Sequence, residues 1–171
     1  KHDMSTGPEP SALAKRLIIV IVAGLTAVLD QASKHLIIQQ VCLHQTVTVI
    51  PGFFNITHIL NPGGAFGFMA GQSQVIRSLL FILVSLVATG FILYLYVRTP
   101  RRHPFLLTAL AMIFGGALGN LAARGRKGAV VDFLDFHVSG LHWPAFNLAD
   151  SAISVGMAVL LYYIIFKKVP V

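Results

Sequence analysis

The sequence is short of charge, and especially of carboxylates. Charged residues make up 11% of the 171 positions, and only six of them are Asp or Glu. Asp3 and Glu9 lie in a polar N-terminal stretch. The apolar remainder of the chain retains four acids: Asp30, Asp132, Asp135 and Asp150. Acidic side chains near hydrocarbon are energetically unfavourable, so those that remain there are candidates for functional residues.

Cysteine is equally scarce, since Cys42 is the only one in the sequence. A single cysteine excludes an internal disulfide and gives no information on the redox compartment. Hydrophobic residues, in contrast, make up 56% of the chain, with a mean hydropathy of +0.77, and they form about four long runs bounded by charges. This pattern excludes an ordinary soluble domain and is typical of an integral membrane protein.

We therefore predict an all-α integral membrane protein with four transmembrane helices. The first helix must be long, because Leu17–Leu29 alone spans roughly 20 Å, less than the ~30 Å hydrocarbon core of a bilayer. It is expected to continue through Asp30 and Lys34, which lie at i and i+4 on one helix face near an interface. The four spans are expected over residues 12–38, 75–97, 105–121 and 145–166.

The longer connections between these spans have different patterns. Runs of β-branched and aromatic residues flank a Pro-Gly pair at 51–52, which predicts a small extracytoplasmic β cap over about 41–70, between helices 1 and 2. The stretch 122–144 is expected to be a loop that carries Arg124 and lies back on the membrane surface.

The N-terminal residues 1–10 are polar and are excluded from the fold. Residues 1–3, ahead of Met4, resemble the remnant of an expression tag, and a flexible leader follows them. Residues 11–171 are then expected to form a single domain.

The net charge of +7 is located where topology signals occur, not where nucleic acid would bind. The basic residues that flank the predicted spans on the side of both termini are Lys15, Arg16, Arg98, Arg101, Arg102, Lys167 and Lys168. Cytoplasmic flanks carry an excess of Lys and Arg, so both termini are expected to be cytoplasmic. A nucleic-acid partner is not expected.

A polar stripe marks the fourth span. Asn147, Asp150, Ser151 and Ser154 follow one another at i, i+3, i+4 and i+7, and in lipid this face must point into the bundle. The third span offers the small-residue string GGALGN at 115–120. We expect its Gly119 to let spans three and four approach, so that Asn120 and Asn147 meet. The glycines are also compatible with plain helix packing, whereas Asp150 requires a partner or a function.

Asp132 lies in the apolar run GAVVDFLDF at 128–136, where its carboxylate is expected to be partly desolvated. If it met Asp150, the two acids could not both ionise easily, and the pair would share a proton. One acid could then act as a base toward water and the other could donate a proton to a carbonyl oxygen. Spacing alone does not establish that the two residues meet.

Five motifs in order resemble those of the bacterial lipoprotein signal peptidase, signal peptidase II. They are DQASK at 30–34, NPGGAF at 61–66, GGALGN at 115–120, VVDF at 130–133 and FNLADS at 146–151. Together with the four spans, the resemblance covers essentially everything after the leader. Several separated motifs in register are much more specific than any one of them alone.

The resemblance implies a metal-independent aspartyl endopeptidase of the bacterial inner membrane, with no cofactor. Such enzymes cut prolipoproteins just before a diacylglyceryl-modified cysteine, so the partners implied are this lipid-modified substrate and membrane lipid, and the chain is expected to be a monomer. By motif, Asp132 and Asp150 would be catalytic. The residues implied to bind substrate are Asn61, Asn120, Arg124 and Asn147, and those implied to support the site are Asp30, Lys34 and Gly64.

The chain departs from the family pattern at one position. The family has an acid before the arginine, as in Asn-x-x-Asp-Arg, and this chain has Ala123. The loss of this acid removes a partner for Arg124 or Asn120 and is expected to weaken the activity.

Three other functions are compatible with parts of the pattern. A small proton-coupled transporter or channel would also place Asp30 and Asp150 in a bundle. A metal hydrolase would have to be built from Asp132, Asp135, His137 and His142, without a helical H-E-x-x-H motif. A structural membrane protein without activity is the third.

Overall fold

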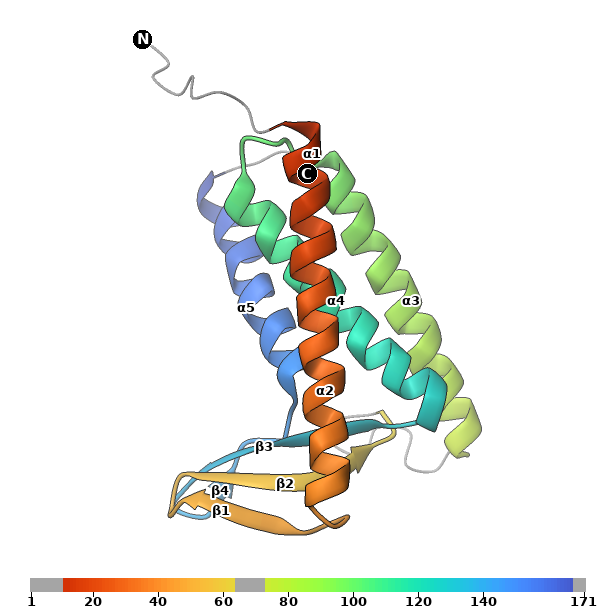
Figure 1. The fold of residues 1–171 in the computed structure, drawn as a ribbon, viewed down its shortest axis with the longest axis vertical. Helices are drawn as coiled ribbons and strands as arrows, with labels where there is room; N and C mark the ends of the chain where they lie inside the picture. Colours follow the sequence, from red (N-terminus) through yellow and green to blue (C-terminus); the bar gives the residue numbers. More distant parts are fainter. Residues whose placement is uncertain (1–10, 64–72, 168–171) are drawn as a thin grey trace.

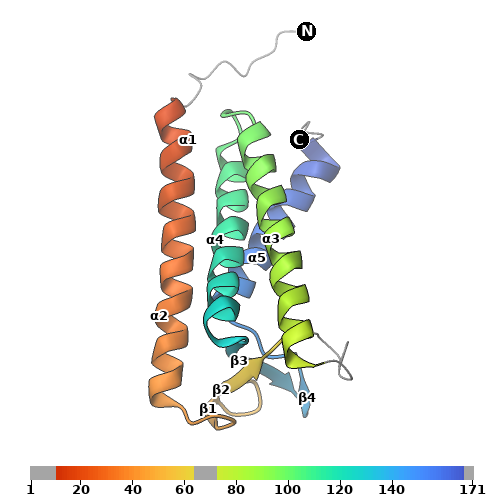
Figure 2. The same ribbon diagram turned by 90° about the vertical axis from the view of Figure 1, so that its right-hand side faces the viewer.

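Four long helices lie side by side, and a small sheet lies at one end of them (Figures 1 and 2). The computed structural model describes residues 11–63 and 73–167. The helical elements are α1 (Ala12–Ile18), η1 (Ile19–Ala23), α2 (Gly24–Gln40), α3 (Gln74–Arg98), α4 (Pro104–Lys127), α5 (Leu148–Tyr162) and η3 (Tyr163–Lys167). The first three form one continuous helix, in which η1 is a π-helical segment. The leader 1–10 and Gly64 lie outside the described residues.

The four long apolar helices predicted from hydropathy are confirmed. Helices long and apolar enough to cross a membrane cover Ala12–Gln40, Val75–Arg98, Pro104–Lys127 and Leu148–Lys167. Their outer faces expose large apolar side chains, among them Val20, Val87 and Phe105. Such a belt is unfavourable in water and suits a surface in contact with lipid.

The third helix is longer than predicted. It runs to Lys127 instead of ending near residue 121, so Arg124 lies on a helix and not in a loop. The apolar run does stop near 121, but Ala and Arg continue the helix because they are strong helix formers. Three basic residues in the last turn also interact favourably with the negative end of the helix dipole. The helix stops at Gly128, which adopts the left-handed conformation with φ 69°.

The sheet is antiparallel, with the order β1-β2-β3-β4. Its strands are β1 (Thr46–Ile50), β2 (Phe54–Asn61), β3 (Val130–Val138) and β4 (Leu141–His142). The predicted strand pair on either side of the Pro-Gly turn is confirmed.

The prediction of a loop around Asp132 was wrong, and the sheet is larger than the predicted β cap. Residues 130–138 form β3, which pairs with β2 over most of its length, including Asn61 opposite Val130 and Ile59 opposite Asp132. β-branched and aromatic residues favour this strand. Its partner strand, however, is distant in sequence: Asn61 and Asp132 are 71 residues apart. The sheet therefore draws on both long connections, not only on the one between helices 1 and 2.

Small residues let the helices approach, although not in the way the sequence indicated. Gly119 does not face α5: a Cβ there would lie 2.5 Å from Asp30 Oδ2, on α2. Gly116 is the residue against α5, where a Cβ would lie 2.6 Å from the carbonyl oxygen of Ala149. Gly156 returns the contact from α5 to the backbone of α4. Two glycines of α4, three residues apart, thus serve two different helix interfaces.

The apolar core of the bundle lies between α3, α4 and α5. Its buried members are Ile92, Leu95, Tyr96, Leu106, Leu107, Leu110, Ala111, Ile113 and Leu160. Much of this core belongs to the end of the bundle away from the sheet, because α4 starts there (Figure 1). The end nearest the sheet is where the polar side chains gather.

The two faces of α4 lead to a stability prediction. Gly116→Ala should destabilise the detergent-solubilised protein by about 1–3 kcal/mol, because the added methyl group forces α4 and α5 apart. The matched control is Gly90→Ala in α3, where nothing lies within 4 Å of the added Cβ. Since alanine favours a helix over glycine by roughly 0.5–1 kcal/mol, the control should be neutral or slightly stabilising. Thermal unfolding of both variants checks this, and equal melting temperatures would contradict the packing.

Candidate active site

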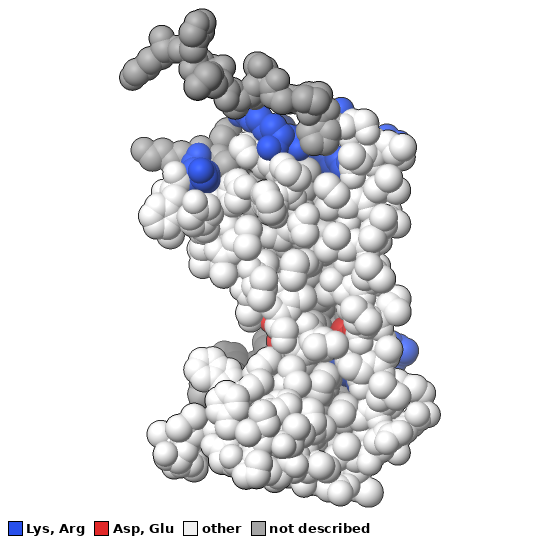
Figure 3. Space-filling model, turned by 60° about the vertical axis from the view of Figure 1, so that its left-hand side comes forward, with Lys and Arg blue, Asp and Glu red and all other residues white. Residues whose placement is uncertain are grey.

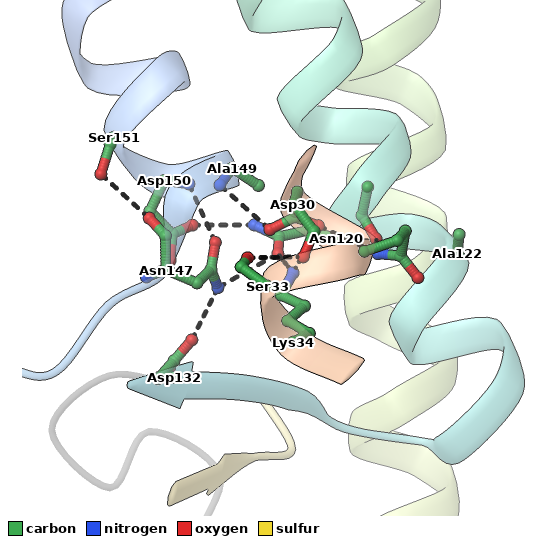
Figure 4. Close-up of polar contacts among 12 residues, drawn as sticks. Asp30, Ser33, Lys34, Asn120, Ala122, Asp132, Asn147, Ala149, Asp150 and Ser151 are labelled. Atoms are coloured by element: carbon green, nitrogen blue, oxygen red, sulfur yellow. Dashed lines mark hydrogen bonds and ion pairs between the residues drawn. The ribbon is translucent and has the colours of Figure 1, made fainter. Parts of the chain in front are cut away.

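Polar side chains from four elements converge where the helices meet the sheet (Figure 4). The residues in this cluster are Asp30 and Lys34 from α2, Asn120 from α4, Asp132 from β3, and Asn147 and Asp150 at the start of α5. The structure thus brings together most of the site residues predicted from the sequence.

Asn147 and Asp150 form the start of α5. Asn147 is the N-cap residue: its Oδ1 accepts a hydrogen bond from the backbone N–H of Asp150 at 3.0 Å, and Asp150 Oδ2 accepts one from the N–H of Asn147 at 3.2 Å. This reciprocal capping box fixes both side chains. The expectation that Asn147 belongs to the helix face was therefore wrong, because α5 begins at Leu148 instead of near residue 145.

Asn147 also links the two acids. Its Nδ2 donates to Asp132 Oδ1 at 2.7 Å and to Asn120 Oδ1 at 3.3 Å. Asn120 Nδ2 in turn donates to Asp150 Oδ1 at 2.8 Å. The predicted approach of Asn120 and Asn147 is confirmed. The fully buried Asn147 thus joins the two carboxylates: Asp132 accepts from its side-chain amide, and Asp150 accepts from its backbone N–H.

A buried ion pair between Lys34 and Asp30 supports this arrangement. Lys34 Nζ donates to Asp30 Oδ2 and to Asn120 Oδ1, both at 2.8 Å. The other oxygen of Asp30 accepts from the N–H of Ala149 at 3.1 Å, which ties α2 to the first turn of α5. Because an ammonium group can only donate, the Asn120 oxygen must face Lys34 and its NH₂ group must face Asp150.

Asp132 has an unusual environment for a carboxyl group. Its side chain is almost completely buried, and Asn61 Nδ2 donates to its Oδ2 at 3.0 Å. Burial raises the pKa of Asp132 to about 6; the hydrogen bonds from Asn61 and Asn147 oppose this rise, and the charge of Asp150 adds to it. A carboxyl group with such a pKa can hold or release a proton near neutral pH.

Arg124 stands beside the cluster on α4. Its guanidinium group lies 6.0 Å from the ring centre of Phe81, and its Nε has no hydrogen-bond partner among the described residues. Together with Asn120 it lines a cavity of about 380 Å³ between α3, α4 and α5, whose other walls are mostly apolar, including Val84, Ile113 and Met157. The cavity is therefore mostly apolar and reaches the polar cluster at Asn120.

Asp135 is not part of the cluster. Its carboxylate accepts hydrogen bonds from Asn55 at 2.9 Å and from His142 at 2.8 Å, all within the sheet. Burial would raise the pKa of Asp135, but these bonds and the charges of His142 and His137 outweigh it, and the pKa is lowered. Within residues 11–63 and 73–167, no group of three or more His, Cys, Asp or Glu side chains is arranged to hold a metal ion.

One contributor was missed in the sequence. Gln31 Nε2 donates to Asp30 Oδ2 and to the carbonyl oxygen of Gly119, both at 2.9 Å, and so completes the shell of the buried carboxylate. No sequence pattern marks this role. The capping box, in contrast, could have been found, since Asn-x-x-Asp before an apolar run is a helix-start signal.

Comparisons with known proteins agree with this arrangement. The sequence profile of the family described as Signal peptidase (SPase) II matches residues 22–166. A lipoprotein signal peptidase of Desulforapulum autotrophicum is 52% identical over 152 residues, which are 89% of this chain and 94% of that protein. A second, from Syntrophus aciditrophicus, is 44% identical with the same coverage.

The fold is also found among solved structures. A bacterial membrane enzyme superimposes with a TM-score of 0.77 at 28% identity, over 86% of this chain and 92% of the other. Profile, relatives and fold agree over nearly the whole folded chain, and the chain therefore belongs to the signal peptidase II family of bacterial membrane proteases.

Proposed function

We propose that this protein is an aspartyl endopeptidase that removes the signal peptide of prolipoproteins just before a diacylglyceryl-modified cysteine. Family membership supports the substrate class. The observation that carries the mechanism is that Asn147 holds both carboxylates, Asp132 through its side-chain amide and Asp150 through its backbone N–H. Nothing in this mechanism requires a metal ion or another cofactor.

The two acids have complementary roles. Asp132, with its raised pKa, is suited to hold the single proton of the pair. Asp150 is only partly buried and takes a proton from water, whose oxygen attacks the scissile carbonyl carbon. The carbonyl oxygen receives the proton of Asp132. When the tetrahedral intermediate collapses, the C–N bond breaks and the leaving amine of the lipidated cysteine takes up the proton that Asp150 had accepted. One hydroxyl group of the intermediate returns a proton to Asp132 as the carbonyl of the product forms, so both acids regain their starting states.

The cavity between α3, α4 and α5 is the proposed substrate cleft. Its apolar walls suit an apolar signal segment or an acyl chain, and its polar end carries Asn120 and Arg124. A guanidinium group whose Nε is unpaired among the described residues is available to bind a substrate carbonyl oxygen. We assign Asn61 and Asn147 to the orientation of Asp132, and Asp30 and Lys34 to the support of Asn120.

The transporter or channel alternative is not favoured. The polar residues gather at one end of the bundle, while buried leucines such as Leu106, Leu107 and Leu110 fill the other part of α4. A path for ions would need polar groups or water along the bundle. Family membership favours a protease instead.

We propose that the protein lies in the inner membrane of the cell. We also propose that residues 11–171 form a single domain and that the protein is a monomer. Lysine and arginine gather at the end of the bundle near both termini and again where the helices meet the sheet, with a zone of uncharged residues between them on this face (Figure 3). The larger number of basic flanks belongs to the end of the termini, which we place in the cytoplasm. The sheet and the candidate site then face outward.

The first prediction from the proposed function concerns the two acids. Asp132→Asn and Asp150→Asn should each lower cleavage of a diacylglyceryl prolipoprotein by at least about 10²–10⁴-fold, the range of general acid–base catalysis. The double variant should be hardly worse than either single one, because the two groups act as a unit. A gel assay of signal-peptide release on purified, folded variants measures this, with and without a chelator, which should make no difference.

The matched control for the acids is Asp135→Asn. Asp135 is also a buried acid of β3 but is bonded within the sheet, so the variant should retain most of the activity. Robust cleavage by Asp150→Asn, or equal losses in all three variants, would sink the proposed pair.

The second prediction concerns Ala123, which stands where the family has an acid. Ala123 lines a small cavity together with Lys34 and Arg126. A carboxylate there would accept hydrogen bonds from these cations and hold Lys34 toward Asn120. Ala123→Asp should therefore raise kcat/KM several-fold. The expected upper limit is about tenfold, which corresponds to roughly 1.4 kcal/mol. Ala123→Asn, which has the same shape without the charge, is the control, and equal activity of all three chains would contradict the role.

The third prediction tests the orientation with the native cysteine. Cys42 is exposed and precedes the sheet, so a membrane-impermeant maleimide should label it in intact spheroplasts. In a Cys42→Ser background, Arg101→Cys at the opposite end should react only after lysis. The reverse pattern at the two positions would place the termini outside.

A further inference from the structure

A second polar pocket lies on the side of the bundle between α2, α4 and the start of β3. Its polar lining residues are Gln31, Lys34, His35, Arg126 and Lys127, and we call it the basic pocket. We propose that the basic pocket binds the phosphate group of an anionic membrane lipid, whose acyl chain lies along the first helix. This proposal does not depend on the proposed catalytic activity.

The pocket has the size and the charge for an oxyanion. Its volume is about 100 Å³, several times the roughly 10–15 Å³ that one water molecule requires. Three of its lining residues are Lys or Arg, a fourth is His35, and none is an acid. Arginine and lysine with a phosphate form strong, charge-assisted hydrogen bonds.

The cations of the pocket are not neutralised within the described part of the chain. Lys34 is paired with Asp30, but Arg126 bonds only to neutral oxygens, those of Gln31 and of the Ala122 backbone. Lys127 is exposed and forms no ion pair among the described residues. Favourable contact with the end of the α4 dipole explains part of this charge, but it does not explain why the cations line a cavity.

The depth of the pocket matches the headgroup level of a bilayer. From Lys15 to Lys34 the first helix rises about 28 Å, close to the ~30 Å hydrocarbon thickness. From Pro104 to Arg126, α4 rises about 33 Å along its axis. The basic pocket thus lies about one membrane thickness away from the basic residues near the termini. Figure 3 shows Lys and Arg side chains at two levels of the molecule.

An apolar groove approaches the pocket along the same helix. The groove has a volume of about 330 Å³ and runs between the first helix and α4, with Val20, Gly24 and Ala27 in its lining. Gln31, Lys34 and Ile38 of the basic pocket continue these positions at spacings of three or four residues, so they share one helix face. A lipid has an anionic headgroup for the cationic pocket and an acyl chain for the adjoining apolar groove, whereas free phosphate would leave the groove unused.

Photo-crosslinking in nanodiscs of phosphatidylcholine and phosphatidylglycerol tests the proposal. A benzophenone amino acid replaces Ile38 in the pocket or, as a reference, the lipid-exposed Val97 at the other end of α3. At position 38, phosphatidylglycerol should be crosslinked roughly fivefold or more above its share of the bilayer, from about 1 kcal/mol per basic residue. A ratio equal to the bulk composition would overturn the site.

Charge variants separate the pocket from general attraction to the membrane. The double variant Arg126→Gln/Lys127→Gln should lower the enrichment to near the bulk ratio, whereas the control Arg101→Gln/Arg102→Gln at the other end should not. Ala123→Asp should lower it and Ala123→Asn should not, because only the former places a negative charge in the pocket. If the double variant folds poorly, Lys127→Gln alone, at an exposed position, gives the same direction. Unchanged enrichment in all of these variants would refute the proposal.

A last arm separates lipid from free phosphate. Excess inorganic phosphate should displace the lipid no better than chloride at the same ionic strength. Selective displacement by phosphate would reassign the pocket to the free anion and overturn the lipid assignment.

Discussion

Lys34 and Asp30 form an ion pair inside the bundle, where both charges would be prohibitively unfavourable without full hydrogen bonding. The orientation of the helix-borne amide and acid in the site follows from this pair. The ammonium group determines which way the Asn120 amide points, and that amide determines which oxygen of Asp150 is held. The second oxygen of Asp30 reaches the backbone of Ala149 and so positions α5 as well. One buried pair therefore sets the geometry of groups on three helices.

The sheet contributes the remaining acid by a different route. Asp132 is brought to the helices because β3 pairs with β2, and because Phe146, just before α5, bonds to the backbone of β3 at Leu134. The same strand pairing places Asn61, at the end of β2, beside Asp132 Oδ2. A strand is a rigid support, and a site built on one is better defined than a site on a loop. The two acids are thus held by two separate systems of backbone hydrogen bonds that meet at Asn147.

Much of this could be predicted from the sequence, and the limits have physical reasons. The four spans follow from hydropathy because a bilayer requires about 20 apolar residues in a helix. The strand pair at 46–61 follows from a local turn signal. β3 could not be found in the same way, since its partner strand is distant in sequence. The predicted end of α4 was wrong because the apolar run stops near residue 121, whereas residues with high helix propensity continue to Lys127.

Within the site, the same distinction applies. Asn120, Asn147 and the acids were found through motifs and an intramembrane location. The bond from Asn147 to Asp132 depends on three-dimensional placement, and only a structure reveals it. Gly119 illustrates an intermediate case, because the sequence indicated a close helix contact correctly but assigned it to the wrong neighbour.

The π-helical segment Ile19–Ala23 has a consequence for how the first helix is held in rotation. A π turn contains about one residue more than an α turn, so the faces before and after it are offset by roughly 100°. Before it, Lys15 Nζ donates to the carbonyl oxygens of Val97 at 2.9 Å and Thr99 at 2.8 Å. After it, Lys34 donates to Asn120 and Asp30 accepts from the backbone of Ala149. The extra residue of the π turn rotates the second half of the helix relative to the first. Lys15 and Lys34 can therefore both reach their partners on the same straight helix.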